Sequence, residues 1–595
     1  MKNNRFLLLL MIVLMSLVMS GCNKENDVVT RNDDALHVGY ISTGFPAMFM
    51  PWLSNQGVAM ELSSMIFSTL FTYDADNDLF AASLADSWEY LVEPTEVPEE
   101  QDYLEVRINL NEEATWSDGT PVTTEDIYFT FDLASDFSKS SHAGTLAWTG
   151  DLMHDYNSDY SGELVRQGIF TKDHPGDYVF TSEDDNVIYL HVKKVLGGIT
   201  PLFTAVLILP EHQYNIISQE VKLNSTNPTT DQSFLYNNPM GSGPYTLDVD
   251  NSGPGIIILN RRDDYHMKDD DGGILYKVES IKYINYLDEI VAINALQEGD
   301  IDVIDNSISN IYINTLNAVD NVVVDSSVNH FVTTLCINLN VPEEYSSPER
   351  ELLKDPILRE AIMLALDQDY LITESLDGQG SSVRGGLFTD TSLYYNEDIP
   401  MDEHDLDKAN QILEDAGYTF EDGAKFRSKD GVTLDFKITG NPANKTTINY
   451  IQVLFEQIGI KVEYHEGGSN PTKDYLYIGD FDMTIQNVLF TMINVDMMFR
   501  AHFTTIGYSS NYGRLENELF SAKINDMRST LDRTRKIDLI LEIQEDLDSM
   551  NYKIPLYTAN TSSAYRTDIF SGWVHVDNVL IFNTDSLQNL THNTK

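Results

Sequence analysis

The sequence is poor in basic residues and in cysteine. Its 595 residues include 38 Lys plus Arg against 93 Asp plus Glu, a formal net charge of −55, and two cysteines. Such a charge repels phosphate backbones and argues against nucleic-acid binding through a basic face. Two cysteines exclude a disulfide framework, and Cys336 lies in an apolar, strand-like stretch that favours a buried side chain over a nucleophile. The 42% of hydrophobic residues still provides enough apolar surface for a large folded body.

Motifs of the common hydrolases and nucleotide-binding proteins are missing. The sequence contains no G-x-x-x-x-G-K-[ST] phosphate loop, no H-E-x-x-H zinc helix and no G-x-S-x-G elbow. Its 13 histidines are scattered, without a spacing typical of a metal site. Asp74, Asp76 and Asp78 resemble the start of a calcium loop, but Leu79 stands where that loop needs glycine. We therefore expect no metal and no cofactor, and an acidic turn between two strands at this place.

The longest apolar run lies near the start of the chain. Residues Phe6–Met19 follow a basic start, which is typical of a secretory signal, and they are too few for a spanning helix of about 20 residues. The run ends in Ser20-Gly21-Cys22, which resembles a bacterial lipobox. We expect residues 1–21 to be removed and Cys22 to carry a lipid. The alternative is an ordinary signal peptide in which Cys22 is incidental.

Strand and helix patterns alternate along the rest of the chain. Leu104–Leu110 and Leu434–Ile438 alternate apolar and polar residues, which predicts half-buried strands. Asp355-Pro356 predicts a helix start, because aspartate is a favourable N-cap and proline fits the first helical turn. Thr123 and Asp126 form a capping-box pattern ahead of another helix. The fold class is therefore mixed α/β.

Several short phrases follow one another in a fixed order. Trp116–Ile127 reads WSDGTPVTTEDI, Gly241–Tyr245 reads GSGPY, and Ala295–Val303 reads ALQEGDIDV. Ala409–Gly417 and Ile554–Leu556 come later. Together they resemble the family 5 extracellular solute-binding proteins of ABC transporters, the oligopeptide- and dipeptide-binding group. Each phrase is rich in turn and cap residues, so the phrases indicate a scaffold and do not specify a ligand.

The resemblance implies a class II periplasmic-binding-protein-like α/β fold with two lobes, a ligand cleft and a hinge, plus an extra subdomain on the first lobe. The expected order begins with the signal peptide at 1–21 and a lipid-anchored tether at 22–35. Lobe I is expected to be discontinuous. The boundaries are 36–80, 200–320 and 550–595 for lobe I, 81–199 for the accessory subdomain and 321–549 for lobe II.

The implied function is capture of peptides by cleft closure and their delivery to the transmembrane subunits of an ABC permease. The protein is expected to be a monomer without enzymatic activity. It would be anchored to the outer face of a bacterial cytoplasmic membrane, or lie in the periplasm of a Gram-negative cell. A non-peptide solute, such as a sugar or a nickel complex, is one alternative. A secreted hydrolase with a carboxylate pair is another, since the separation of two carboxylates depends on the three-dimensional structure.

One aspartate is a candidate ligand anchor. In peptide-binding relatives an aspartate of the second lobe pairs with the N-terminal ammonium of the ligand. The matching stretch here is Val488–Phe499, whose only acid is Asp496; Met497 replaces the proline of the family pattern, and the tryptophan is missing. Asp496 either anchors an ammonium or caps the helix that follows it.

Four further residues are predicted to contact the ligand. Met497 and Gln486 belong to the same region of lobe II as Asp496. Phe45 and Trp52 belong to an aromatic and methionine cluster after the first strand. Such side chains suit a pocket that tolerates varied ligands, but they suit a hydrophobic core equally well.

Overall fold

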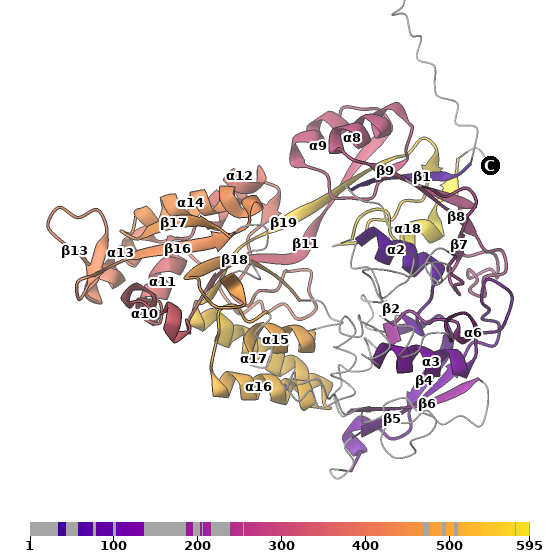
Figure 1. Ribbon diagram of the computed structural model, residues 1–595, viewed down its shortest axis with the longest axis horizontal. Coiled ribbons are helices and arrows are strands. Elements are labelled where there is room, and N and C mark those ends of the chain that lie inside the picture. The colour runs from indigo at the N-terminus through magenta and orange to yellow at the C-terminus, as the bar shows by residue number, and fades with distance from the viewer. Residues whose placement is uncertain are drawn as a thin grey trace, which may run out of the picture.

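The fold is given by a computed structural model, in which two lobes are joined by two long strands (Figure 1). The structure describes residues 34–42, 57–74, 79–98, 103–135, 186–193, 203–204, 206–215, 238–253, 255–467, 475–490, 495–504, 510–577 and 579–593.

Strands supply the framework of both lobes. They are β1 (Leu36–Ile41), β2 (Phe71–Asp74), β3 (Leu79–Ala82), β4 (Ala85–Tyr90), β5 (Tyr103–Leu110), β6 (Val187–Lys193), β7 (Tyr245–Leu247), β8 (Ile256–Arg261), β9 (Ser280–Tyr286), β10 (Val303–Ile304), β11 (Val322–Ile337), β12 (Gly380–Ser381), β13 (Thr419–Phe420), β14 (Arg427–Lys429), β15 (Val432–Thr433), β16 (Asp435–Gly440), β17 (Lys461–Glu466), β18 (Met483–Leu489), β19 (Lys553–Arg566), β20 (Phe570–Ser571) and β21 (Thr591–His592).

Helices cover these strands. They are α2 (Gly57–Ile66), α3 (Thr124–Ser135), α6 (Glu211–Tyr214), α8 (Glu289–Glu298), α9 (Asn310–Leu316), α10 (Pro348–Leu352), α11 (Pro356–Ala365), α12 (Gln368–Leu376), α13 (Leu406–Asp415), α14 (Lys445–Glu456), α15 (Val495–Phe503), α16 (Glu518–Ser529), α17 (Arg533–Met550) and α18 (Thr584–Asn589), with short 3-10 turns η1 (Pro94–Glu96), η4 (Glu343–Tyr345) and η5 (Pro442–Asn444).

One sheet runs through both lobes. Its strand order is β17-β16-β18-β11-β19-β10-β1-β9-β8-β7, with β12 beside β19. In lobe I the central strand β1 is parallel to β9 and β10, and in lobe II β16 is parallel to β17 and β18. The mixed α/β fold class predicted from the sequence is confirmed.

The long strands β11 and β19 are antiparallel partners and connect the two halves of this sheet. The first part of β11 pairs with residues 560–566 of β19, and the last part, from Val332, pairs with residues 553–558. The register shifts between Val328 and Val332, where Asn329 Nδ2 donates to Thr561 Oγ1 at 2.9 Å. Such an irregularity bends a strand pair and raises its local twist. The connection between the lobes is therefore a ribbon with a bend built into its middle.

Each lobe has its own hydrophobic core. Buried Tyr245 and Tyr283 belong to the lobe I core, and Phe436 and Ile451 belong to the lobe II core. The sheet β4-β5-β6 adds apolar side chains such as Val106 to the lobe I core. A third, smaller cluster, which includes Ile293, packs against the ribbon at Val322 and Ala564. Separate cores linked by a ribbon favour movement of whole lobes over distortion within a lobe.

Local predictions from the sequence are confirmed in several places. Asp355 Oδ1 accepts a hydrogen bond from Ile357 N at 3.0 Å and caps α11, which begins at Pro356. The alternating segments form β5 and β16. β2 and β3 pair as antiparallel neighbours, and residues 75–78 of the predicted acidic turn lie outside the described residues. Cys336 is a buried free cysteine.

The WSDGTPVTTEDI phrase is a joint between a turn and α3. Asp126 is buried, and its Oδ2 accepts from Thr123 N at 2.8 Å and from Trp116 Nε1 at 3.2 Å. Its Oδ1 accepts from Glu211 N at 2.8 Å. One carboxylate thus fixes the start of α3, the fully buried indole and the start of α6.

We predict that Gly119→Val lowers the free energy of unfolding by about 1 to 2 kcal/mol, because a β-branched residue disfavours the left-handed conformation. Gly119 has φ +86°, and a Cβ there would meet no atom within 4 Å, so the cost is conformational and not steric. Gly119→Asn is the matched control, since asparagine tolerates this conformation. Urea unfolding and solute affinity are measured together. A loss of affinity at unchanged stability would place this joint in the ligand site.

Candidate functional site

The structure describes only part of the predicted site. Gln486 and Asp496 are described, and both belong to the segment that runs from β18 into α15. Cys22, Phe45 and Trp52 lie outside the described residues, as does the side chain of Met497. The site is therefore built from the lobe II residues around β18 and α15.

Gln486 links β18 to the helix that covers it. Its Nε2 donates to Ser510 O at 3.0 Å and contacts His502 Nδ1 of α15 at 3.3 Å. Burial and then the nearby Lys553 hold the pKa of His502 well below its usual value, so the imidazole is neutral and accepts this bond. Gln486 Oε1 is enclosed and has no hydrogen-bond partner in the described part of the chain. Such an oxygen is an acceptor in need of a donor.

Lys553 of β19 places a buried amine near His502, beneath α15. It pairs with Cys336 across β11 and β19, and its Nζ lies 4.7 Å from the centroid of the Phe503 ring. Nζ has no hydrogen-bond partner among the described residues. Burial lowers the pKa of this lysine to about 8. Its charge therefore costs stability near neutral pH.

We predict that Lys553→Met raises the free energy of unfolding at pH 7 by about 1 to 3 kcal/mol, because methionine fills the site without a buried charge. The folded-state pKa lies below the ordinary value, so the wild-type lysine regains stability as the pH rises above about 8. The gain should therefore shrink between pH 7 and pH 10 in urea unfolding. Lys461→Met removes an exposed ion pair with Asp435 and serves as the control, with little change expected. If Lys553→Met instead lowers the free energy of unfolding, Nζ must donate a stabilising hydrogen bond, and the prediction is wrong.

Asp496 is paired within the chain. The aspartate lies in the first turn of α15, which begins at Val495, and not at the N-cap. Its Oδ2 accepts from Lys536 Nζ of α17 at 2.8 Å, with side chains that are 12% and 10% exposed. Its Oδ1 is enclosed and has no partner in the described part of the chain. The carboxylate is thus neutralised by one lysine and only half satisfied as an acceptor.

Lys536 was missed in the sequence although a signal for it exists. It stands on the apolar stripe of α17, three and four residues before the buried Leu539 and Ile540. A lysine at a core position of a helix needs an acidic partner, because an unpaired buried ammonium is costly. The apolar periodicity of α17 indicates that Lys536 needs an acidic partner. It does not identify that partner as Asp496, which lies 40 residues away.

Aromatic side chains surround the start of α15. The rings of Phe388 and Phe490 stack at 4.6 Å between centroids, and Phe490 lies 4.8 Å from Phe499. Burial and then the charge of Asp496 raise the pKa of Tyr394 to about 12. The paired carboxylate therefore lies in a poorly hydrated, aromatic setting, where electrostatic interactions are strong.

A carboxylate pair also occurs in lobe I, between Asp305 at the carboxyl end of β10 and Glu61 of α2. Asp305 is 2% exposed, its N–H donates to Gly39 O at 2.9 Å, and Tyr283 OH donates to its Oδ2 at 3.3 Å. Burial and then the neighbouring Glu61 raise the pKa of Asp305 well above its usual value. This acid holds the ends of β1 and β10 together through its backbone N–H. Within the described residues, no group of three or more His, Cys, Asp and Glu could hold a metal ion.

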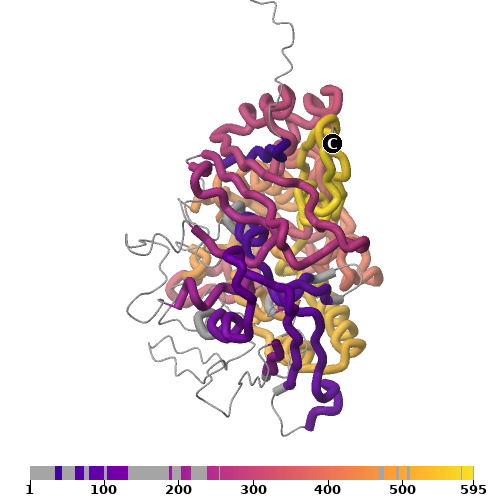
Figure 2. The backbone as a smooth tube through the Cα atoms, turned by 90° about the vertical axis from the view of Figure 1, so that its right-hand side faces the viewer, coloured from indigo at the N-terminus to yellow at the C-terminus, as the bar shows by residue number. Residues whose placement is uncertain are grey.

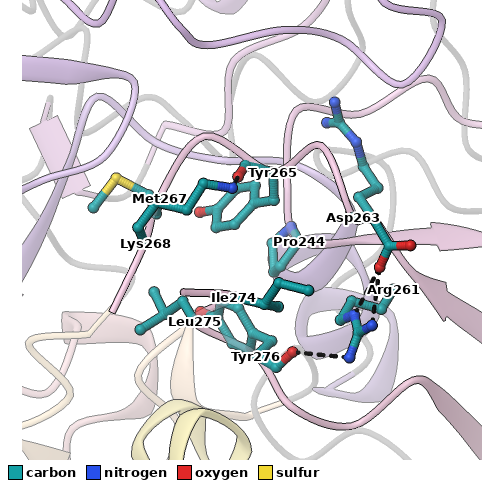
Figure 3. Close-up of a pocket in the computed structure, with 10 residues that line it drawn as sticks. Pro244, Arg261, Asp263, Tyr265, Met267, Lys268, Ile274, Leu275 and Tyr276 are labelled. Atoms are coloured by element: carbon teal, nitrogen blue, oxygen red, sulfur yellow. Dashed lines mark hydrogen bonds and ion pairs between the residues drawn. The ribbon is translucent and has the colours of Figure 1, made fainter. Parts of the chain in front are cut away.

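A small concavity of about 200 Å³ lies elsewhere in lobe I, between the end of β8 and the loop before β9 (Figure 3). It is bordered by Pro244, Tyr265 and Tyr276, and Arg261 on its rim pairs with Asp263 at 2.9 Å. Neither Asp496 nor Gln486 lines it. We do not assign it to the site.

Comparison with known proteins gives the family. The family described as bacterial extracellular solute-binding proteins, family 5 Middle, matches residues 80–510. The chain belongs to this family. The resemblance predicted from the short phrases is thereby confirmed.

Relatives match along most of the chain. The oligopeptide-binding protein AppA of Bacillus subtilis is 24% identical over 486 residues, which cover 78% of this chain and 76% of AppA. The oligopeptide-binding protein OppA of Lactococcus lactis subsp. lactis is 23% identical over 489 residues, with 78% and 76% covered.

Solved structures share the fold. The periplasmic oligopeptide-binding protein of Thermotoga maritima has a TM-score of 0.73 and 18% identity, over 94% of this chain and 98% of that one. AppA of Bacillus subtilis in complex with a nonapeptide has a TM-score of 0.64 and 19% identity, with 94% and 98% covered. NikZ of Campylobacter jejuni in complex with Ni(L-His) has a TM-score of 0.67 and 16% identity, with 94% and 99% covered. The predicted two-lobed, periplasmic-binding-protein-like fold is confirmed.

Proposed function

We propose that this chain is the substrate-binding component of an ABC importer, which captures peptides between its lobes and delivers them to the permease. The observation that carries the proposal is the match of peptide-binding proteins, over about three quarters of their length, to about three quarters of the chain. The two cores joined by β11 and β19 fit a protein that closes on its ligand. Binding without turnover is the proposed activity.

Closure is proposed to occur by bending of the β11–β19 ribbon. The register shift after Val328 leaves a place where the strand pair is already irregular. β18 pairs with β11 only from Phe331 onward, and β10 pairs with β19 only at Ala564 and Tyr565. β12 also pairs with β19, at Thr558 and Ala559. Bending is therefore proposed at residues 560–563 of β19, which pair with β11 and with no other strand. In Figure 2, seen from the lobe I side, the indigo and magenta segments of lobe I lie in front of the orange segments of lobe II.

The ligand is proposed to contact lobe II through Gln486 and Asp496. Each carries one enclosed oxygen without a partner in the described part of the chain, and each belongs to the β18–α15 segment. Peptide N–H groups are the donors that such oxygens need. Met497, Phe45 and Trp52 are proposed as apolar contacts that accept varied side chains. The lobe and subdomain boundaries given above remain part of the proposal.

A non-peptide solute is the alternative, since NikZ, which shares the fold, holds a nickel–histidine complex. Mass spectrometry of the solutes that co-purify with the mature chain distinguishes the two. Peptides are expected in the eluate. A nickel complex or a sugar alone would replace the peptide proposal.

We predict that Gln486→Met weakens binding of a nonapeptide pool about tenfold, because it removes a buried amide whose oxygen is proposed to accept from the ligand. Gln452→Met is the matched control: Gln452 also donates to a backbone oxygen, Val462 O at 2.8 Å, but lies on α14. Binding is read as a rise in unfolding temperature with peptide, together with recovery of uncleaved peptide. Equal losses in the two variants, or cleavage of the peptide, would count against the proposed site or the proposed activity.

The chain is further proposed to be a monomeric lipoprotein anchored at the outer face of the cytoplasmic membrane. In the part of the chain that the structure describes, no helix has both the length and the apolar character needed to cross a bilayer. Lipid on Cys22 is proposed to supply the attachment, with residues 22–35 as the tether.

We predict that Cys22→Ser moves the protein from the membrane fraction to the soluble fraction without changing its unfolding temperature, because the anchor is separated from the folded body. Cys336→Ser is the control: the fraction should stay unchanged, since that thiol is enclosed within lobe II. Membrane association that persists in Cys22→Ser would contradict the lipoprotein proposal.

A further inference from the structure

The ion pair between Asp496 and Lys536 changes what the proposed site can accept. The carboxylate and the ammonium lie 2.8 Å apart, and each side chain is about nine-tenths enclosed. Lys536 thus supplies, from within the chain, the cation that an enclosed carboxylate needs. The pair as a whole is neutral.

The acceptor that remains is Oδ1, which has no partner in the described part of the chain. A ligand ammonium on Oδ1 would place a second cation on one carboxylate and leave the enclosed site with a net positive charge. Displacing Lys536 instead would leave that ammonium enclosed and unpaired. Both outcomes carry the desolvation cost of an uncompensated charge. A neutral N–H donor satisfies Oδ1 without either cost.

We infer that the Asp496–Lys536 pair selects ligands that present a neutral N–H donor, such as an amide, in preference to a free N-terminal ammonium. The inference rests on the proposed function and narrows its substrate class to peptides with blocked amino termini, or to internal peptide segments. Lys536 acts as a positioning residue, because it fixes and neutralises Asp496 and need not touch the ligand. This differs from the ammonium anchor that was one of the two interpretations of Asp496 from the sequence.

The test is a competition between two versions of one probe. A pool of lysine-free nonapeptides and the same pool acetylated at its amino termini are mixed equally with the full mature protein. Unbound peptide is removed by gel filtration, and the retained ratio of acetylated to free peptide is measured by mass spectrometry. Unmutated protein should retain the acetylated pool in excess over the free pool. Equal retention, or an excess of the free pool, would overturn the inference without any substitution.

The variants assign the preference to the pair. Lys536→Met leaves Asp496 as an unpaired anion, so the retained ratio should shift toward the free pool by about tenfold. Asp496→Asn combined with Lys536→Met leaves no charge, so the ratio should return to that of the unmutated protein. Lys523→Met is the matched control, because Lys523 pairs with Asp546 between α16 and α17 and does not contact Asp496. A ratio that does not change in Lys536→Met would also overturn the inference.

The outcomes separate this inference from the proposed function. Peptides that bind with an unaltered preference for the free amino terminus contradict the inference alone. Failure of both pools to bind any variant contradicts the proposed function, and the inference fails with it. Thermal unfolding of each variant without peptide identifies any loss of folding. If Lys536→Met fails to fold, the double variant, which has no charge at positions 496 and 536, still tests the preference.

Discussion

The antiparallel pairing of β11 with β19 is the constraint on which the rest of the molecule depends. The two strands, of 16 and 14 residues, are the elements shared by both halves of the large sheet. β10, and through it the strands of lobe I, attaches at the carboxyl end of β19, while β18 and the strands of lobe II attach at the carboxyl end of β11. Each lobe then closes its own core on its side of the ribbon. Any relative motion of the lobes has to pass through the few residues between these attachments, which is where the register shifts.

The local features of the fold could be predicted from the sequence because their causes are local. Asp355 caps α11 through a bond to a residue two positions away, and Asp126 reaches back three residues to Thr123. Such contacts depend only on spacing, so a pattern of residue types is enough to predict them. The same holds for the alternation that forms β5 and β16, whose period is set by the geometry of a strand.

The candidate site could not be predicted to the same depth because its contacts join distant segments. Asp496 was identified as the only acid in its stretch, but its partner Lys536 belongs to another helix. Gln486 faces His502 and Ser510 only because β18 lies beneath α15. In both cases the sequence places a polar residue at a position where the pattern predicts an apolar one, which indicates that the residue has a buried partner. Choosing the partner requires the packing of β18, α15 and α17 together.

Lobe II holds several polar groups beneath α15, and their burial costs free energy of folding. Lys553, His502 and Gln486 lie between the central strands and α15, and each is desolvated. Hydrophobic side chains of similar size would stabilise such a layer better. A binding protein has a reason to keep such groups in one lobe. A ligand that supplies their missing hydrogen-bond partners gains binding free energy, because the groups are unsatisfied without it. On the proposed function, the same logic applies to Asp496, whose charge is balanced by Lys536 before a ligand binds. An unpaired anion would favour only cationic ligands. A neutral ion pair with one carboxylate oxygen that still lacks a donor instead favours the N–H group that every peptide carries.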